Sequence, residues 1–225
     1  MKNLLFTILL HLILFHDGGS QSLLSGDLVT EQLVRMPSKS ELLDNDYDGS
    51  PFLNDSFQNG TLTIRNQPGL VLPMRYNIYQ DVMEVKFRGR MMQINPGDLI
   101  QSILLGKETL VPVKYPWESS MRQGLLFLLD SGKVNLYKKR NIQFEPWRAA
   151  RAQEAGPKRA RFKESLESFF LEFSNHKVVT LEKAKDLPLL FHDHRNELDD
   201  FFSKNKIKLK EDKLKELIHF YNSLQ

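Results

Sequence analysis

The segment Met83-Glu84-Val85-Lys86-Phe87-Arg88 alternates apolar and charged residues along its whole length. Successive side chains of a β-strand point to opposite faces of the sheet, so this alternation predicts a strand with one buried and one exposed face. The segments 61–64 and 74–78 carry similar apolar rows, and turn-forming residues separate them at 66–69. The middle of the chain is therefore predicted to form an antiparallel sheet.

Glycine-containing connections continue this pattern toward the C-terminus. Asp130-Ser131-Gly132 joins two strand-like runs, 124–129 and 133–139, and a loop of about three residues with a glycine is a standard hairpin connection. A further strand pair is expected at 168–173 and 176–179. Strands spaced by about 8–12 residues with such turns favour a sandwich or a partly open barrel over a parallel sheet.

After Thr180 the sequence period changes from strand-like to helical. Three short helices are expected at 181–191, 195–204 and 213–224. In the last of them, apolar residues recur at the spacing of one helix face, namely Leu214, Leu217, Ile218 and Tyr221. This stripe is expected to pack on the sheet or on the preceding helix. The predicted fold class is α+β, a predominantly antiparallel β sandwich or partly open barrel followed by a small C-terminal helical subdomain.

The N-terminus has the three parts of a secretory signal peptide. A short start with Lys2 precedes an apolar run at 4–15, and the small residues Gly18 and Ser20 stand where a signal peptidase reads the chain. A buried helix or a membrane anchor is the alternative, but a membrane span needs about 20 apolar residues. We therefore expect residues 1–20 to be removed and the mature chain to contain no transmembrane segment. The protein is expected in the periplasm, at the cell surface or outside the cell.

The expected mature chain divides into three parts. These are an acidic, mostly irregular arm at 21–56, an antiparallel β domain at 57–180 and the helical subdomain at 181–225. The chain contains no cysteine, which excludes disulfides, thiolate nucleophiles and cysteine-ligated zinc. The formal net charge of +3 at pH 7 is ordinary, so nothing in the total demands a nucleic-acid partner.

The charges are distributed unevenly along the chain. The acidic arm contrasts with residues 133–163, which carry ten lysines and arginines against two glutamates. A basic loop at 146–163 combines cations with an aromatic residue, and its candidate ligand-binding residues are Trp147, Arg148, Arg151, Arg159 and Arg161. Outside the cytosol the anionic partners would be lipid headgroups, phosphorylated sugars or acidic protein arms, including the protein's own arm. A solvated loop without a ligand is the alternative.

One acidic turn copies the spacing of a calcium-binding loop. Gly49 stands at its sixth position, where the chain must turn sharply, and the candidate metal ligands are Asp44, Asp46, Asp48 and Asp55. Two features disfavour calcium: Pro51 occupies the eighth position, and the twelfth is an aspartate rather than the longer glutamate. A solvated acidic turn is the preferred interpretation. No cofactor is therefore expected, and calcium is the one ion to test.

Histidines offer an alternative with catalytic chemistry. A hydrolase or metal-dependent enzyme would use His176, His192, His194 and nearby carboxylates, provided that the imidazoles converge on one point in a cleft. However, 192–194 falls in an expected turn between helices, where polar side chains are common in any case. The sequence contains neither a Gly-x-Ser-x-Gly nor a His-Glu-x-x-His motif.

Three blocks carry a resemblance to known proteins. They are Gly-Ser-Pro-Phe-Leu-Asn-Asp-Ser-Phe at 49–57, Leu-Pro-Met-Arg-Tyr-Asn-Ile-Tyr at 72–79 and Leu-Ile-His-Phe-Tyr-Asn-Ser-Leu at 217–224. On these blocks the chain resembles a family of uncharacterised exported proteins of Bacteroidota, in which similar blocks stand in the same order. The resemblance implies a periplasmic or surface-associated protein and transfers no catalytic residue. The leading hypothesis is a non-enzymatic exported envelope protein that acts as a binding or scaffold module, with an envelope protein or an anionic surface component as its partner.

Overall fold

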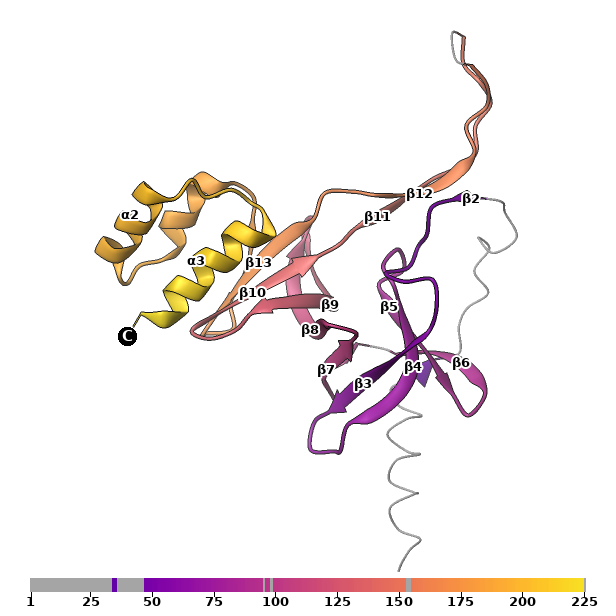
Figure 1. The fold of residues 1–225 in the computed structure, drawn as a ribbon, viewed down its shortest axis with the longest axis horizontal. Helices are drawn as coiled ribbons and strands as arrows, with labels where there is room; N and C mark the ends of the chain where they lie inside the picture. Colours follow the sequence, from indigo (N-terminus) through magenta and orange to yellow (C-terminus); the bar gives the residue numbers. More distant parts are fainter. Residues whose placement is uncertain (1–33, 36–46, 95, 98, 153–154, 225) are drawn as a thin grey trace, which may run out of the picture. The chain divides into compact units, whose positions relative to one another are not determined.

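The computed structural model describes residues 34–35, 47–94, 96–97, 99–152 and 155–224 (Figure 1). The expected leader at 1–20, and most of the acidic arm including Asp44 and Asp46, lie outside these residues. Within the described residues, no helix is long and apolar enough to cross a membrane.

Eleven strands of the described chain form one sheet, and each neighbouring pair in it is antiparallel. In sheet order they are β1 (Val34–Arg35), β6 (Arg90–Ile94), β5 (Val82–Phe87), β4 (Leu70–Asn77), β3 (Gln58–Ile64), β7 (Ile100–Leu105), β8 (Glu108–Trp117), β9 (Ser120–Asp130), β10 (Val134–Lys139), β13 (Ser168–Phe173) and β14 (Val178–Leu181). The chain runs outward from β3 to β6 and then returns, so that β7 pairs with the other side of β3. The predicted hairpin around Asp130-Ser131-Gly132 and the strand at 168–173 are confirmed.

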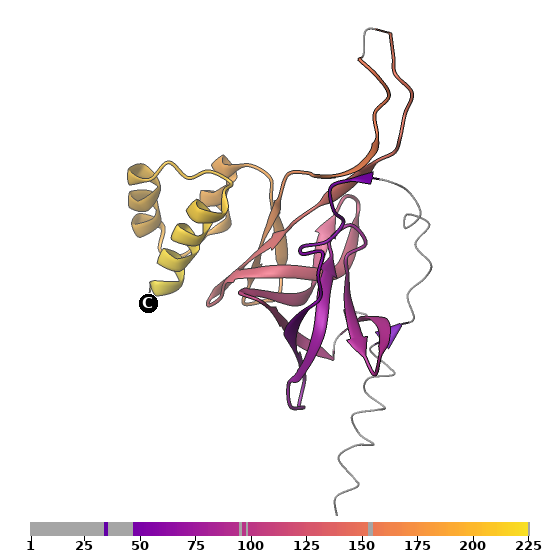
Figure 2. The same cartoon turned by 45° about the vertical axis from the view of Figure 1, so that its right-hand side comes forward.

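The sheet curls (Figure 2). Side chains from strands that are not neighbours in the sheet therefore meet in one buried cluster. The rings of Tyr115 on β8 and Phe170 on β13 lie 4.9 Å apart, although β9 and β10 separate these two strands in the sheet. Val113, Leu126 and Tyr137 join the same buried cluster. The fold is therefore α+β, a partly open barrel with a small helical end, and the predicted fold class is confirmed.

The apolar rows that predict the sheet are fully buried, at Met74, Tyr76, Met83 and Val85. Glu84 departs from the alternation, because the sequence places it on the exposed face and the structure leaves it only 6% exposed. The cause is the Arg75 side chain, whose Nε donates to Glu84 at 2.8 Å and whose guanidinium lies over the Phe52 ring, 3.7 Å from its centroid. The outer face of β4 and β5 is therefore covered at this point.

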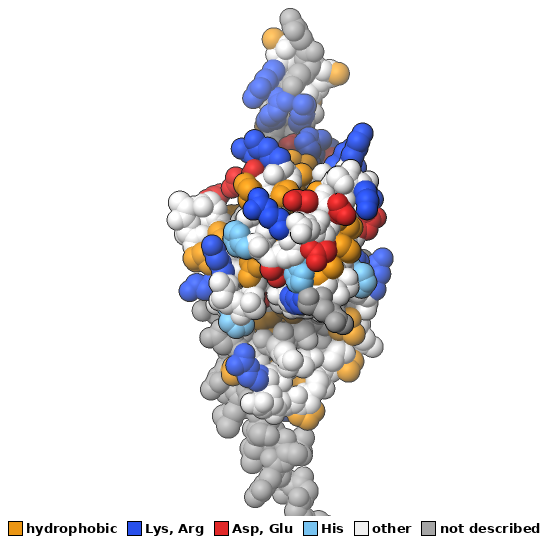
Figure 3. Space-filling view, turned by 90° about the vertical axis from the view of Figure 1, so that its left-hand side faces the viewer, with side chains coloured by type: hydrophobic (Ala, Val, Ile, Leu, Met, Phe, Trp, Pro, Cys, Tyr) orange, Lys and Arg blue, Asp and Glu red, His pale blue; other side chains and the backbone are white. Residues whose placement is uncertain are grey.

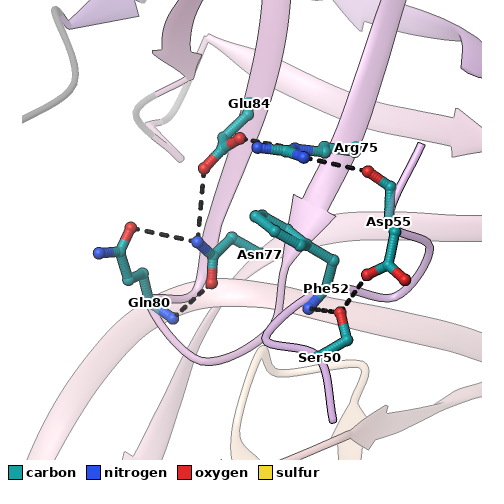
Figure 4. Close-up of polar contacts among 7 residues, drawn as sticks. All are labelled: Ser50, Phe52, Asp55, Arg75, Asn77, Gln80 and Glu84. Carbon is teal, nitrogen blue, oxygen red and sulfur yellow. Dashed lines mark hydrogen bonds and ion pairs between the residues drawn. The ribbon is translucent and has the colours of Figure 1, made fainter. Parts of the chain in front are cut away.

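The segment around Phe52, which covers this part of the sheet, is held in place by its own hydrogen bonds (Figure 4). The Ser50 hydroxyl donates to the Asp55 carboxylate and accepts from the Phe52 N–H at 3.0 Å. On the other side, Asn77 accepts from the Gln80 N–H at 3.0 Å and lies 3.4 Å from Glu84. The block at 49–57 therefore packs as part of the sheet's surface rather than as a loose arm.

Three short helical segments follow the sheet: the 3-10 helix η1 (Ala184–Leu190), α2 (Arg195–Lys204) and α3 (Glu211–Ser223). They lie within a few residues of the predicted helices, and Pro188 lies inside η1, where it cannot donate a backbone hydrogen bond. The predicted stripe of α3 is buried, and it packs with Val134, Leu136, Phe169 and Leu171 of β10 and β13. The helices therefore cover the outer face of these two strands.

A smaller sheet of three strands completes the described structure. β11 (Ile142–Glu145) is antiparallel to β12 (Ala160–Glu164), and β2 (Tyr47–Asp48) runs parallel to β12. The predicted basic loop at 146–163 is only partly a loop, because residues 160–163 belong to the strand β12, which pairs with β11. The residues between β11 and β12 extend beyond the large sheet in both ribbon views (Figures 1 and 2). The end of the acidic arm therefore lies beside the basic segment.

Replacing Leu217 with alanine tests the packing of α3. Leu217 is fully buried, so Leu217→Ala is expected to lower the free energy of unfolding by about 2–5 kcal/mol, measured by urea denaturation. Lys215 is exposed on the same helix, and Lys215→Ala is expected to change this free energy by less than about 0.5 kcal/mol. Equal losses in the two variants would contradict the observed packing.

Candidate functional site

The basic hairpin, which we define as residues 142–164, carries the predicted ligand-binding residues. At its base, Arg161 donates to Glu145 at 2.7 Å, and Arg159 lies 3.2 Å from the Asp48 carboxylate. The hydrogen bond from Arg161 lowers the pKa of Glu145. Two of the five predicted binding residues therefore take part in intramolecular ion pairs that hold the base of the hairpin together.

Aromatic rings fasten this base to the turn between β4 and β5. The Phe162 ring is buried, and its centroid lies 4.9 Å from that of Tyr47, 5.0 Å from Phe144 and 5.2 Å from Tyr79. Gly49 passes so close that a Cβ at this position would overlap the Phe162 carbonyl oxygen, and its φ of 79° also favours glycine. Packing therefore fixes the base of the hairpin.

The tip of the basic hairpin, residues 146–158, has the composition of a binding surface. Trp147 is 61% exposed, which is unusual for so large an aromatic side chain. Arg148 and Lys158 exchange two backbone hydrogen bonds of 3.0 Å, so two cations stand opposite each other, and Arg151 is exposed beyond them. Lysine and arginine side chains gather on this extension at the top of Figure 3. The tip therefore joins an exposed indole to several positive charges.

The described members of the predicted calcium set have other partners. Asp48 lies beside Arg159, and Asp55 accepts a hydrogen bond from Ser50. Asp44 and Asp46 lie outside the described residues. In the part of the chain that the structure describes, no group of three or more His, Asp or Glu side chains could hold a metal ion. The calcium site stays a prediction.

The histidines of the enzyme hypothesis have separate surroundings. His176 lies in the β13–β14 turn with its Nδ1 3.3 Å from Glu172, whereas His194 precedes α2 with its Nδ1 3.8 Å from Glu197. His192 is exposed two residues earlier. In Figure 3 the histidine side chains are dispersed rather than gathered. The enzyme hypothesis stays a prediction for which the described residues assemble no histidine metal site.

A buried polar network that the sequence did not predict lies where the β4–β5 turn meets β9 and β10. Lys139 forms an ion pair with Asp81, and its Nζ donates to the Tyr76 hydroxyl at 2.9 Å and to the Leu125 carbonyl oxygen at 3.3 Å. The Tyr76 hydroxyl in turn donates to Asp81 at 2.6 Å. Lys139 and Asp81 are 3% and 7% exposed. The ammonium group, which has three protons, therefore has three acceptors. We call these four residues the lysine network.

Burial shifts the acid–base properties of this region. It lowers the pKa of Lys139, although the attraction to Asp81 acts in the opposite direction. Burial also raises the pKa of Tyr76 well above its ordinary value, and the charge of Asp81 adds to the effect. The neighbouring Tyr115 hydroxyl is buried without a hydrogen-bond partner among the described residues, and burial raises its pKa to about 12. Both tyrosines are therefore protonated at neutral pH.

The lysine network is not visible in the sequence because its two charged members, Asp81 and Lys139, resemble ordinary surface residues. Asp81 is a turn residue with a φ of 57°, a conformation that aspartate tolerates, and Lys139 stands in a charged run between Lys138 and Arg140. Strand alternation does contain a signal, since it puts Lys139 on the inner face with Tyr137. Lys138 then points to the other face, where it pairs with Glu211 of α3 at 2.5 Å. A lysine on each face of an internal strand requires a charged contact on each side.

A second polar cluster lies at an open end of the curled sheet. Glu172 accepts hydrogen bonds from Tyr137 and from Asn135, the latter at 3.0 Å, and also contacts His176. Burial alone would raise the pKa of Glu172, but these hydrogen bonds outweigh it and the pKa is lowered. The cluster borders a cavity of about 440 Å³ whose wall also includes Val178. Because Glu172 is engaged by its neighbours, the cluster stabilises the pairing of β10 with β13.

Comparison with known proteins gives no match: no family model, no curated protein and no solved structure is similar to this chain. The resemblance to exported proteins of Bacteroidota therefore stays a prediction. The function has to be inferred from the residues and their geometry.

Removing one member of the buried ion pair tests the lysine network. Lys139→Met leaves the buried Asp81 carboxylate with only the more distant, half-exposed Arg122 as a cation, so we expect the free energy of unfolding to fall by about 3–5 kcal/mol. The double variant Asp81→Asn/Lys139→Met removes both charges and is expected to regain a large part of this loss. Urea denaturation measures both, with Lys114→Met as the exposed control. Additive losses in the double variant would show that the two charges are not coupled.

Proposed function

We propose that the protein is a non-enzymatic exported binding module of the cell envelope, which holds an anionic surface component with the tip of the basic hairpin. The observation that carries this proposal is the combination of exposed Trp147 with Arg148, Arg151 and Lys158 on a loop that extends beyond the sheet. An indole suits the boundary between water and an apolar layer, and cations near it attract anionic headgroups.

The construction of the hairpin supports a binding role. Its base is fixed by the Phe162 aromatic cluster and by the ion pairs of Arg159 and Arg161, so the tip is presented from a fixed support. The residues of the tip that the structure describes contribute nothing to the buried core. The buried aromatic residues of the base and the exposed indole of the tip are therefore separated along the same hairpin.

The hydrogen bonds and ion pairs of two carboxylates, Glu172 and Asp81, also favour a binding role over the enzyme hypothesis. Glu172 is engaged by Tyr137 and Asn135, and Asp81 is paired with Lys139. A catalytic acid or base must be able to reach a proton on the substrate. These carboxylates instead serve as acceptors within the protein.

Sedimentation with phospholipid vesicles tests the proposal. The mature chain is expected to bind vesicles rich in phosphatidylglycerol more strongly than vesicles of phosphatidylcholine, and less strongly when salt shortens the Debye length from about 10 Å to about 3 Å. Arg148→Glu/Arg151→Glu is expected to weaken binding to the anionic vesicles by about tenfold or more. Thermal denaturation of this variant checks that the fold is retained.

The matched control is Lys206→Glu/Lys208→Glu, which changes the net charge by the same amount at two exposed lysines between α2 and α3. A hairpin-specific contact predicts that this control binds almost as well as the unaltered protein. Equal weakening of the two variants would mean that only the total charge matters. Equal binding to both kinds of vesicle would contradict the proposal outright.

A further inference from the structure

A cavity of about 320 Å³ lies beside the lysine network, at the junction of the large sheet with the base of the basic hairpin. Its wall includes Asp81, Arg122 and Lys139 as charged residues and Tyr79 and Trp117 as aromatic ones. β11 contributes Gln143 and the residue after β12 contributes Ser165, so that four separate segments of the chain meet around it. This volume lies at the lower end of the range for ligand sites and equals about ten water molecules.

The charges of the wall favour an anion. The Asp81 carboxylate is already offset by Lys139, with which it forms an ion pair. Arg122 also forms a long ion pair with Asp81, so the three charged side chains of the wall carry a net charge of +1. Its Nη2 lies 4.0 Å from the Asp81 carboxylate, which is too long for a hydrogen bond, so the N–H donors of the guanidinium are not used on that carboxylate. The side chain of Arg122 is 46% exposed, which places it at the entrance of the cavity.

The aromatic residues in the cavity wall favour a ligand with a flat apolar part. Trp117 is half-buried and meets the Tyr115 ring edge-on at a centroid distance of 6.0 Å, while Tyr79 is held by Phe162. Both rings are therefore positioned before any ligand arrives. Aromatic walls with one cation at the entrance suit a molecule that has a flat apolar part and a carboxylate, because a guanidinium pairs with a carboxylate through two parallel hydrogen bonds.

We infer that this cavity is a binding site for a small planar organic carboxylate, which pairs with Arg122 and rests its apolar part on Tyr79 and Trp117. Lys139 holds Asp81 in place and keeps its negative charge from repelling the ligand. The site does not include the tip of the basic hairpin. It can therefore be tested separately from the proposed membrane contact.

Three nearly isosteric probes that differ in charge test this inference: benzoate, the neutral benzamide and the cationic benzamidine. The chain has two tryptophans, so the Trp147→Phe variant leaves Trp117 in the cavity wall as the sole indole reporter. Titration followed by Trp117 fluorescence and by the indole N–H signal in NMR spectra is expected to show saturable binding of benzoate. Benzamide and benzamidine are expected to bind at least about tenfold more weakly.

Substitution of Arg122 identifies the group that recognises the charge. Arg122→Gln is expected to weaken benzoate binding by about fivefold to tenfold, and Arg122→Lys by less, because lysine keeps the charge without the planar donor pair. The matched control is Arg90→Gln, which removes an exposed arginine from β6 outside the cavity and is expected to leave binding unchanged.

Three outcomes would overturn the inference. They are a benzoate dissociation constant weaker than about 10 mM, equal binding of benzoate and benzamide, or equal effects of Arg122→Gln and Arg90→Gln. Vesicle binding is expected to be the same for Arg122→Gln and the unaltered protein. If Arg148→Glu/Arg151→Glu loses vesicle binding but keeps benzoate binding, the vesicle contact is made by the tip of the hairpin and the cavity is a separate site.

Discussion

The buried ion pair of Lys139 with Asp81 fixes where the turn between β4 and β5 meets β10. Asp81 belongs to the turn between β4 and β5, whereas Lys139 ends β10, and the two are buried in direct contact, with the Tyr76 hydroxyl hydrogen-bonded to both. A buried charge without its partner is costly, so the two parts of the sheet have one favourable arrangement. An apolar contact at this place would tolerate sliding, but an ion pair with hydrogen bonds in fixed directions does not.

Much of the fold can be predicted from the sequence because its signals are local. The alternation around Val85, the glycine turn after Asp130 and the helical stripe of α3 each lie within a dozen residues, and the structure confirms all three. Glu84 and Lys139 are different. Each looks exposed from its neighbours in sequence, and each is buried by a segment that joins it only in the folded chain.

The same distinction applies to the candidate site. Composition identifies the basic hairpin, since a cluster of cations with Trp147 is visible without coordinates. It does not show which cations act on the protein itself: Arg159 and Arg161 hold the base through Asp48 and Glu145. The cavity beside Lys139 leaves no trace in the sequence, because its wall is assembled from the β4–β5 turn, β8, β9, β10 and the hairpin.

Because the base and the tip of the basic hairpin are separate, the sequence of the tip can change during evolution without disturbing the base. Among the described residues of the hairpin, Ala160 and Phe162 belong to the core, and those of the loop that follows Glu145 add none. Lengthening such a loop costs little, about 0.6 kcal/mol of closure entropy for each doubling. Insertions, deletions and exchanges at the tip are therefore nearly neutral for the scaffold, and lineages are free to acquire new specificities there while β11 and β12 keep their geometry.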